Sequence, residues 1–264
     1  MKTYHWSCHR YALLSSIVVA LLSPCASSSS PTAPTHLRSF DKVHPVGTDS
    51  RPYFGWYVND PDDDEIQMAY QILVATSQDK LDAGQGDLWD SGQVKSAAQN
   101  YVYHEGRALA HGRRYYWKVR TWDKNGNVSP YSAPGQFDTG LFTTRHWAGA
   151  KWIKRDTEEA DDYTYYRRQV LLPDHTIQRA IVYVTAGHNY ELYINGTLVG
   201  QGLAYHYPQY HYYNAYDVTS ALTSQGDNTF AALTHWYGGG QGRARGVDLS
   251  GKRPPPGRPR RFRA

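Results

Sequence analysis

Cysteine is nearly absent from this sequence of 264 residues, and its placement excludes several kinds of chemistry. The two cysteines, Cys8 and Cys25, both lie within residues 1–26. That stretch has the layout of a secretory signal peptide, because an apolar run at 11–22 follows basic residues and precedes small residues that suit cleavage near Ala26. We therefore predict a secreted, extracellular chain whose mature form has no disulfide, thiol nucleophile or cysteine metal site.

Long apolar runs, coiled-coil heptads and Gly-X-Y repeats are also missing. The one apolar run is too short to span the roughly 30 Å hydrocarbon core of a bilayer, so we expect no membrane association after signal cleavage. These absences exclude multi-span membrane proteins, coiled coils and collagens. General disorder is excluded as well, because 23 Tyr, 8 Trp and 6 Phe supply ample surface to bury.

The excess of positive charge is confined to the two ends of the chain. The formal net charge is +4, but residues 1–26 carry +2 and residues 243–264 carry +7, which leaves −5 for residues 27–242. A mildly acidic folded region predicts no nucleic-acid partner. The basic end, 243–264, has no hydrophobic periodicity, so we predict a disordered Pro/Arg-rich tail.

Short aromatic and β-branched segments between these ends predict an all-β fold of two consecutive β-sandwiches. After a linker at 27–34, residues 35–143 predict a sandwich of the fibronectin type III or immunoglobulin kind, with Trp56 and Trp117 in its core. Leu109 lies six residues before Tyr115, with a glycine between them. This pattern is typical of a tyrosine corner, in which the hydroxyl bonds to backbone a few residues upstream.

A second block, residues 147–242, predicts a jelly-roll-like sandwich that stops short of its expected closing strands. Asn195-Gly196 predicts the turn of a hairpin, because both residues tolerate positive φ angles. It places Leu192 and Ile194 together on one face. The β-branched segment 179–186 is predicted to be a central strand of its sheet.

No catalytic constellation emerges from the residues. The motifs of serine hydrolases, phosphate loops, dinucleotide sites and zinc proteases are absent from the sequence. Acidic clusters at 62–65 and 158–162 fall in polar loops, where we expect solvated carboxylates rather than the opposed pair that a glycosidase needs. His206 and His211 have no carboxylate between them, so we predict no metal site, and nothing indicates a cofactor.

A tyrosine-rich segment is the candidate for ligand contact. Exposed aromatic rings can stack on the apolar face of a sugar while their hydroxyls bond its rim. Alternatively, these tyrosines fill the sandwich and its edge. The candidate carbohydrate-binding residues are Tyr205, Tyr207, Tyr210, Tyr212 and Trp236. Two tripeptides, at Asn127 and Asn195, are formal N-glycosylation acceptors.

A series of motifs runs through both blocks. They are Ala69-Tyr-Gln-Ile-Leu-Val-Ala75, Asp87-Leu-Trp-Asp-Ser-Gly92, Tyr115-Tyr-Trp-Lys-Val-Arg120 with Trp122-Asp123, Phe137-Asp-Thr-Gly140, Tyr190-Glu-Leu-Tyr-Ile-Asn-Gly196, Tyr216-Asp-Val-Thr219 with Leu222, and Trp236-Tyr237. In this order, over residues 35–242, the chain resembles the N-terminal part of the bacterial-type α-L-rhamnosidases, a family of glycoside hydrolases. Each motif is weak alone, and the specificity lies in the series.

The resemblance implies hydrolysis of terminal α-L-rhamnose from plant glycosides and polysaccharides, with inversion, by carboxylates on an (α/α)6-barrel that follows such sandwiches. Nothing from Arg243 onward matches that barrel, so no catalytic residue is assigned. We expect an accessory region, truncated before the barrel and inactive alone, whose implied partners are rhamnose-containing glycans. Two other interpretations stay open: a stand-alone secreted carbohydrate-binding module, and an adhesion or structural scaffold.

Overall fold

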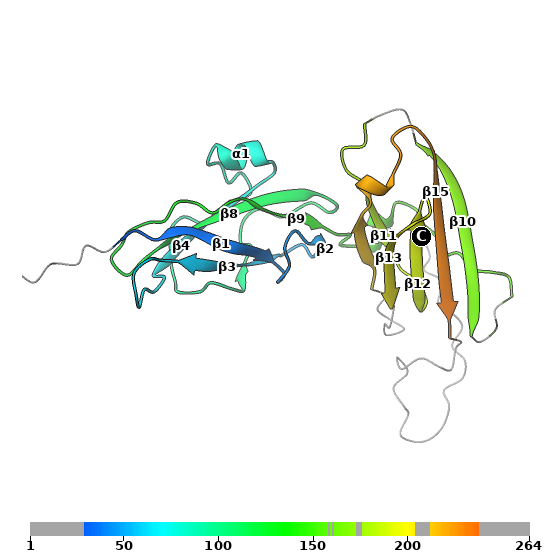
Figure 1. The fold of residues 1–264 in the computed structure, drawn as a ribbon, viewed down its shortest axis with the longest axis horizontal. Coiled ribbons are helices and arrows are strands. Elements are labelled where there is room, and N and C mark those ends of the chain that lie inside the picture. Colours follow the sequence, from blue (N-terminus) through cyan, green and yellow to red (C-terminus); the bar gives the residue numbers. More distant parts are fainter. Residues whose placement is uncertain (1–28, 158, 160, 173–175, 204–211, 238–264) are drawn as a thin grey trace, which may run out of the picture.

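The computed structural model describes residues 29–157, 159, 161–172, 176–203 and 212–237, and these form two β-sandwiches in succession (Figure 1). The all-β fold class predicted from the sequence is confirmed. The proposed leader and the basic tail lie outside the described residues. Within the part of the chain that the structure describes, no helix is long and apolar enough to cross a membrane.

The first sandwich pairs a three-stranded sheet with a six-stranded one. The smaller sheet contains β1 (Thr32–Ser39), β3 (Tyr53–Asn59) and β7 (Val102–Tyr103). The larger contains β2 (Val46–Thr48), β9 (Gly135–Thr139), β8 (Arg114–Trp122), β4 (Ala69–Ala75), β5 (Trp89–Asp90) and β6 (Val94–Lys95). A short helix, α1 (Gln78–Asp82), follows β4 and buries Leu81.

Strand β8 explains why these residues form a sandwich. Its alternate residues Tyr115, Trp117 and Val119 are buried, while the residues between them are partly exposed, as the alternation of the sequence predicts. Trp117 (1% exposed) and Trp56 pack in the main hydrophobic cluster, which confirms both as core residues. The tyrosine corner is also confirmed, because the Ala110 N–H donates to the Tyr115 hydroxyl over 2.8 Å.

The second sandwich consists of a four-stranded and a two-stranded sheet. The larger sheet has the order β10 (Asp162–Leu172), β15 (Gly226–Trp236), β12 (Asn189–Ile194) and β13 (Thr197–Leu203). The smaller pairs β11 (Ile181–Val184) with β14 (Asn214–Asp217). Two 3-10 turns, η1 (Thr144–Trp147) and η2 (Thr219–Ala221), precede β10 and follow β14.

Local signals in this half of the chain have mixed outcomes. The hairpin is confirmed, because β12 and β13 meet at Asn195 and Gly196, whose φ angles are 50° and 82°. Leu192 and Ile194 of β12 are both buried, as the hairpin predicts. The prediction of a central strand at 179–186 is wrong, because β11 pairs with β14 alone among the described strands and its residues are only half-buried. Branched side chains suit any half-buried pleated face, so they do not specify a central position.

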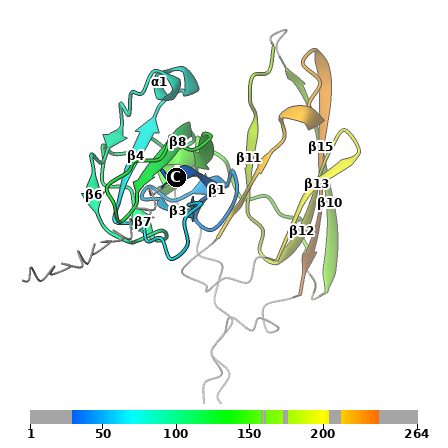
Figure 2. The same cartoon turned by 60° about the vertical axis from the view of Figure 1, so that its left-hand side comes forward.

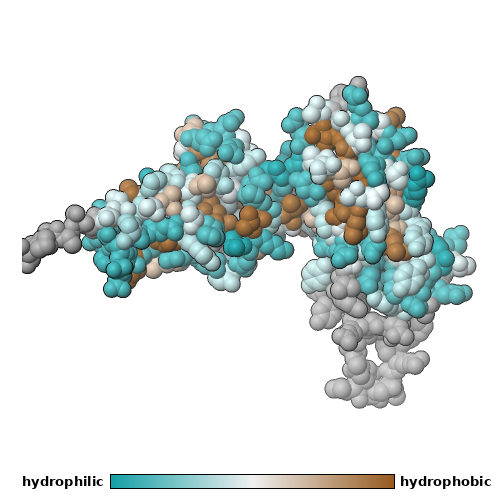
Figure 3. Space-filling model, in the orientation of Figure 1, coloured by the Kyte–Doolittle hydropathy of each residue, from teal (hydrophilic) through white to brown (hydrophobic). Residues whose placement is uncertain are grey.

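The arrangement of the sheets places the smaller sheet of the second sandwich toward the first. Strand β11 lies on the side nearest the first sandwich, and β10 and β15 lie on the far side (Figures 1 and 2). A space-filling view shows more hydrophobic surface over the second sandwich than over the first (Figure 3). Across the junction, β14 of the second sandwich contacts β2 of the first.

Candidate functional site

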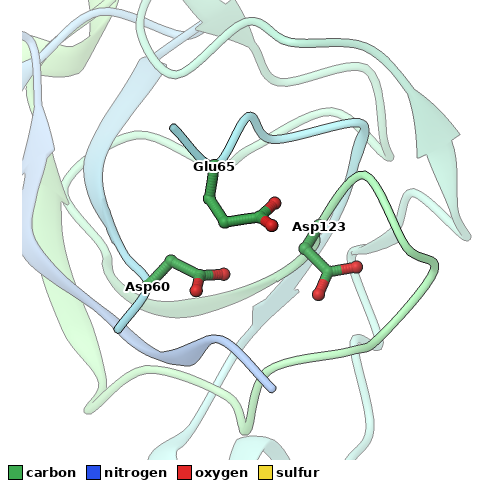
Figure 4. Close-up of side chains that lie close together, drawn as sticks. All are labelled: Asp60, Glu65 and Asp123. Carbon is green, nitrogen blue, oxygen red and sulfur yellow. The ribbon is translucent and has the colours of Figure 1, made fainter. Parts of the chain in front are cut away.

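Three carboxylates approach one another at one end of the first sandwich (Figure 4). Asp60 and Glu65 come from the loop after β3, and Asp123 begins the turn after β8. One oxygen of each lies within 4.8 Å of the others. Among the described residues, this is the group that could offer three ligands to a hard cation such as Ca²⁺.

The hydrogen bonds of this cluster give it a structural role. The Asp123 carboxylate accepts the backbone N–H groups of Asn125 (2.8 Å) and Asn127 (2.7 Å) and the Asn127 side-chain amide (2.8 Å). Glu65 receives the Lys124 ammonium at 3.1 Å and the Asn125 side-chain amide at 3.3 Å. These donors satisfy the hydrogen-bonding capacity of the Asp123 and Glu65 carboxylates. The cluster therefore holds the loop after β3 against the turn after β8.

This geometry corrects one expectation about the acidic loops. The carboxyl-bearing side chain of Glu65 is 5% exposed, so it is not solvated as its polar loop predicts. The turn at Asp123 folds over it, a contact between residues about sixty positions apart that local polarity does not reveal. In the second acidic loop, Asp161 pairs with His235 and Asp162 with Arg155.

The pKa values of Asp87 and Asp217, which lie outside these loops, are lowered. Burial alone would raise the pKa of Asp87, yet hydrogen bonds from Lys80 and Thr76 outweigh it and hold the pKa below 3.8. Burial likewise opposes the hydrogen bonds from Thr219 and Arg114 that keep the pKa of Asp217 low. A general acid in glycoside hydrolysis needs the opposite shift, so these two groups are unsuited to that role.

The predicted carbohydrate-binding residues fall in different places. Tyr205, Tyr207 and Tyr210 lie outside the described residues. Tyr212 is exposed just before β14, where its carbonyl accepts the Thr185 hydroxyl. Trp236 is half-buried at the last position of β15, in the other sheet. The structure therefore leaves their role in sugar binding a prediction.

The two formal glycosylation acceptors have amides that hydrogen-bond within the protein. Asn195 Nδ2 donates to the Ala221 carbonyl (2.9 Å) and to Asn228 Oδ1 (2.8 Å), and its own Oδ1 accepts the Thr229 N–H (2.9 Å). Asn127 Nδ2 donates to the Asp123 carboxylate. A glycan on either nitrogen would have to replace these hydrogen bonds.

The junction between the sandwiches depends on a residue that the sequence did not single out, Tyr213. Its hydroxyl accepts the Leu141 N–H (2.7 Å) and donates to the Leu141 carbonyl (3.1 Å), so it clamps the connecting segment. Its ring meets Trp147 and Tyr183 edge-on. Gly140 makes room for the clamp, because a Cβ there would collide with the Tyr213 hydroxyl.

An ion-pair network crosses the same junction. Arg114 of β8 binds the buried Asp138 of β9 through two hydrogen bonds of 2.9 Å and also reaches Asp217 of the second sandwich at 3.3 Å. Arg179 of the second sandwich approaches Asp138 from the other side, at 3.5 Å. Bidentate pairing fixes the orientation of the Arg114 and Asp138 side chains within the first sandwich. Each of them then pairs with a residue of the second sandwich, Asp217 or Arg179, so ion pairs join the two sandwiches here.

Two family models match the chain. Residues 34–143 match the N-terminal immunoglobulin domain of Rha78A-like proteins, and residues 175–256 match the α-L-rhamnosidase N-terminal domain. The second match continues beyond residue 242, the predicted end of this sandwich. Both domains are therefore of kinds that α-L-rhamnosidases contain.

Known proteins give the same result. The α-L-rhamnosidase of Formosa agariphila is 33% identical over 227 residues, covering 74% of this chain and 24% of that protein. The solved structure of the Dictyoglumus thermophilum α-L-rhamnosidase has a TM-score of 0.70 at 31% identity, covering 80% of this chain and 26% of that chain. The Aspergillus terreus enzyme, 23% identical, shares the fold with a TM-score of 0.62, over 78% of this chain and 24% of its own.

The chain spans about a quarter of the length of the relatives that it matches. The resemblance inferred from the sequence motifs is confirmed by both family models and by these relatives. Because the matches follow one another through both sandwiches, the chain belongs to the α-L-rhamnosidase family of glycoside hydrolases and represents its N-terminal region.

Proposed function

We propose that this chain is the accessory N-terminal region of a secreted α-L-rhamnosidase and does not hydrolyse glycosides by itself. The observation that supports this most is the pair of matched domains, both N-terminal, in a chain about a quarter as long as its relatives. The substrates of the whole protein would be glycans with terminal α-L-rhamnose. Accordingly, the machinery for proton transfer would lie on polypeptide that is not part of these sandwiches.

The arrangement of carboxylates supports the absence of hydrolysis. Cleavage of a glycosidic bond needs one carboxyl group as acid and a second as base or nucleophile, held on opposite sides of the bond. Glu65 and Asp123 lie close together, but backbone and side-chain N–H groups occupy their oxygens. These hydrogen bonds join the two loops, which supports a structural role for both carboxylates.

The direct test is an activity assay on the purified chain. We expect no release of p-nitrophenol from p-nitrophenyl α-L-rhamnopyranoside above the buffer rate between pH 4 and 8. The full-length Formosa agariphila relative, assayed in parallel, controls for the substrate. Turnover by this chain that persists through repurification would overturn the proposal.

Export is a separate part of the proposal. Residues 1–26 have the layout of a signal peptide, so expression in a secreting host should release a chain that begins just after Ala26. Intact-mass measurement of the medium and of the cell pellet tests this. Retention of the uncleaved chain in the cell would exclude secretion without affecting the family assignment.

A second candidate function is carbohydrate binding by the chain itself. Exposed tyrosines occur on both sandwiches, including Tyr57, Tyr101, Tyr165 and Tyr212. Tyrosine rings and hydroxyls suit sugar recognition. This binding role and an accessory role are compatible, since a glycan-binding module can serve an enzyme to which it is attached.

A further inference from the structure

The outer face of the three-stranded sheet carries a cluster of aromatic side chains. Tyr53 of β3 stands directly opposite Tyr103 of β7, while the neighbouring pair, Phe54 and Val102, points into the core. The Tyr53 ring lies 5.7 Å from Tyr103 and 5.1 Å from Tyr101, measured between centroids. These rings are therefore neighbours on a surface that faces away from the core.

The cluster continues on either side of Tyr53. The Phe40 ring, which follows β1, lies 4.9 Å from Tyr53. Tyr57 is four residues further along β3, about 13 Å away in an extended strand. Strands β1 and β3 run side by side here (Figure 1). The rings thus form a row along the strand rather than a single contact.

Gly55 lies in the middle of this row, buried beneath Asn100. It occupies the outer-face position between Tyr53 and Tyr57, and a Cβ there would lie 2.6 Å from the Asn100 side-chain oxygen. The glycine lets this polar amide approach the strand between the aromatic groups. This surface has aromatic rings at both ends and a hydrogen-bonding amide between them. Such an arrangement suits an extended ligand made of several sugar rings.

Exposure distinguishes these rings from core residues. Tyr101 is 60% exposed, Tyr57 is 58% exposed and Tyr103 is also exposed. By contrast, Phe54 and Trp56 on the opposite face of β3 are buried. The outer rings therefore contribute little to the hydrophobic core, and their clustering calls for another reason.

Backbone strain at the same place supplies a second, independent observation. Phe40, Tyr101 and His36 have φ angles of 50°, 54° and 53°, in the left-handed region that bulky L-residues avoid. The His36 ring stacks on Tyr57 at 4.7 Å, so all three strained residues present rings to the same surface. Strain of this kind persists where the surrounding structure enforces it, and it gathers at binding sites.

Cations border the cluster. The Arg51 guanidinium lies over the Tyr103 ring at 5.0 Å and pairs with the Glu105 carboxylate at 3.7 Å, while Arg38, Asp41 and Lys42 lie close to Phe40 in the sequence. Asp41 accepts the Tyr53 hydroxyl over 2.7 Å, which raises the pKa of Tyr53 to about 12 and keeps the phenol neutral. Because the Arg51–Glu105 pair is exposed, it contributes little stability, and a ligand carboxylate can take the place of Glu105 beside Arg51.

We propose that Phe40, Tyr53, Tyr57, Tyr101 and Tyr103, with Arg51, form a binding platform for an oligosaccharide that bears carboxylate groups. The ring faces would stack on the C–H faces of successive sugars, and Arg51 would pair with a uronate. The inference goes beyond the proposed function by assigning a binding site to the first sandwich, and it rests on that function for the choice of a glycan.

The test is calorimetric titration of the purified chain with a rhamnogalacturonan hexasaccharide and, separately, with the same oligosaccharide after its carboxyl groups are reduced. The variants are Tyr101→Asn, which keeps a residue that tolerates a positive φ, and Tyr103→Ala. Tyr165→Ala is the matched control, because Tyr165 is 80% exposed on β10 of the second sandwich. Circular dichroism verifies that each variant is folded.

We expect the unmodified hexasaccharide to bind and each platform variant to weaken binding by about five- to tenfold. The reduced oligosaccharide should bind more weakly than the acidic one, and Tyr165→Ala should leave affinity unchanged.

No binding at 10 mM sugar, or equal affinity in folded platform variants, would overturn the platform while leaving the family assignment and the lack of hydrolysis intact. Loss of binding only in Tyr165→Ala would overturn it too, since it would place the site on the second sandwich. Association of the chain with itself, abolished by the platform variants without any sugar binding, would identify a protein interface instead.

Discussion

The two sandwiches differ in how they are stabilised. The first has a continuous core in which Phe54, Trp117 and Phe137 are almost completely buried. In the second, the hydrophobic cluster among the described residues is centred on Ala186, Tyr190 and Leu192. More hydrophobic surface remains visible on the second sandwich (Figure 3). We therefore expect the first sandwich to fold independently, whereas the second gains less stability from the burial of apolar surface.

Polar contacts partly replace hydrophobic burial in the second sandwich. The Tyr190 hydroxyl bonds to that of Tyr216 (3.0 Å) and accepts the Asn214 amide (2.7 Å). Asn228 of β15, fully buried, accepts the Thr223 N–H of the preceding loop (2.8 Å) and the Asn195 side-chain amide (2.8 Å). Together with Tyr213, these contacts suggest a rule: the second sandwich depends on hydrogen bonds and on its neighbour, whereas the first depends on its core.

The largest losses of stability should come from core substitutions, each of which should act on one sandwich only. Trp117→Ala should destabilise the first sandwich by about 3–5 kcal/mol, because it removes a buried ring and leaves a cavity. Leu192→Ala should cost about 2 kcal/mol and act on the second sandwich. Calorimetry with two resolved transitions measures both. Equal shifts of both transitions by either variant would contradict separate cores.

A smaller effect should appear at the junction. Tyr213→Phe removes the acceptor of the Leu141 N–H and should lower the second transition by about 1–3 kcal/mol with little change in the first. Gly140→Ala should also lower the second transition, since a Cβ would strike the Tyr213 hydroxyl. It should lower the first transition as well, because the same Cβ would lie 2.9 Å from the Gly47 carbonyl oxygen. If both variants leave the second transition unmoved, the sandwiches are stable independently.

The tyrosine corner offers a milder perturbation within the first sandwich. Tyr115→Phe keeps the buried ring and removes the hydroxyl that accepts the Ala110 N–H. We expect a loss of about 1 kcal/mol, confined to the first transition, in a urea denaturation curve. An unchanged midpoint would mean that water replaces the hydroxyl at no cost.

The smallest expected change in stability is its pH dependence near neutrality, which two buried histidines produce. Burial, with a lesser contribution from the Arg51 charge, lowers the pKa of His104 below 6.5, and burial does the same for His188 in the second sandwich. Each folded state therefore resists a proton that the unfolded chain accepts, so stability is full above pH 6.5 and falls as the pH drops through 6.5 toward the folded pKa. His104→Gln should flatten this slope for the first transition only, as measured by melting scans from pH 7.5 to 5. A steeper slope in the variant would contradict the sign.

Local features of the fold could be predicted from the sequence. The alternation in β8, the Asn195-Gly196 turn and the tyrosine corner each depend on residues close together in the chain. Features set by distant partners could not be predicted in this way. Glu65 is buried by a turn about sixty residues later, and β11 lies beside β14 because of how the chain closes.

The candidate binding surface was also predictable only in part from the sequence. The sequence placed Phe54 and Trp56 on one face of β3, which leaves Tyr53 and Tyr57 on the other. It did not reveal that β7 would bring Tyr103 beside Tyr53. Composition alone identifies the tyrosine-rich segment that contains Tyr205, Tyr207, Tyr210 and Tyr212, whereas the clustered rings of the first sandwich assemble only through strand pairing.

One measurement tests the central claim, that this region recognises glycans and leaves hydrolysis to other polypeptide. The purified chain is titrated with the rhamnogalacturonan hexasaccharide in a calorimeter, and the sugar is then recovered and analysed by mass spectrometry. We expect heat of binding and an intact hexasaccharide. Free rhamnose in the recovered sample, lost when Glu65→Gln and Asp123→Asn are introduced, would contradict it and place catalysis within these sandwiches.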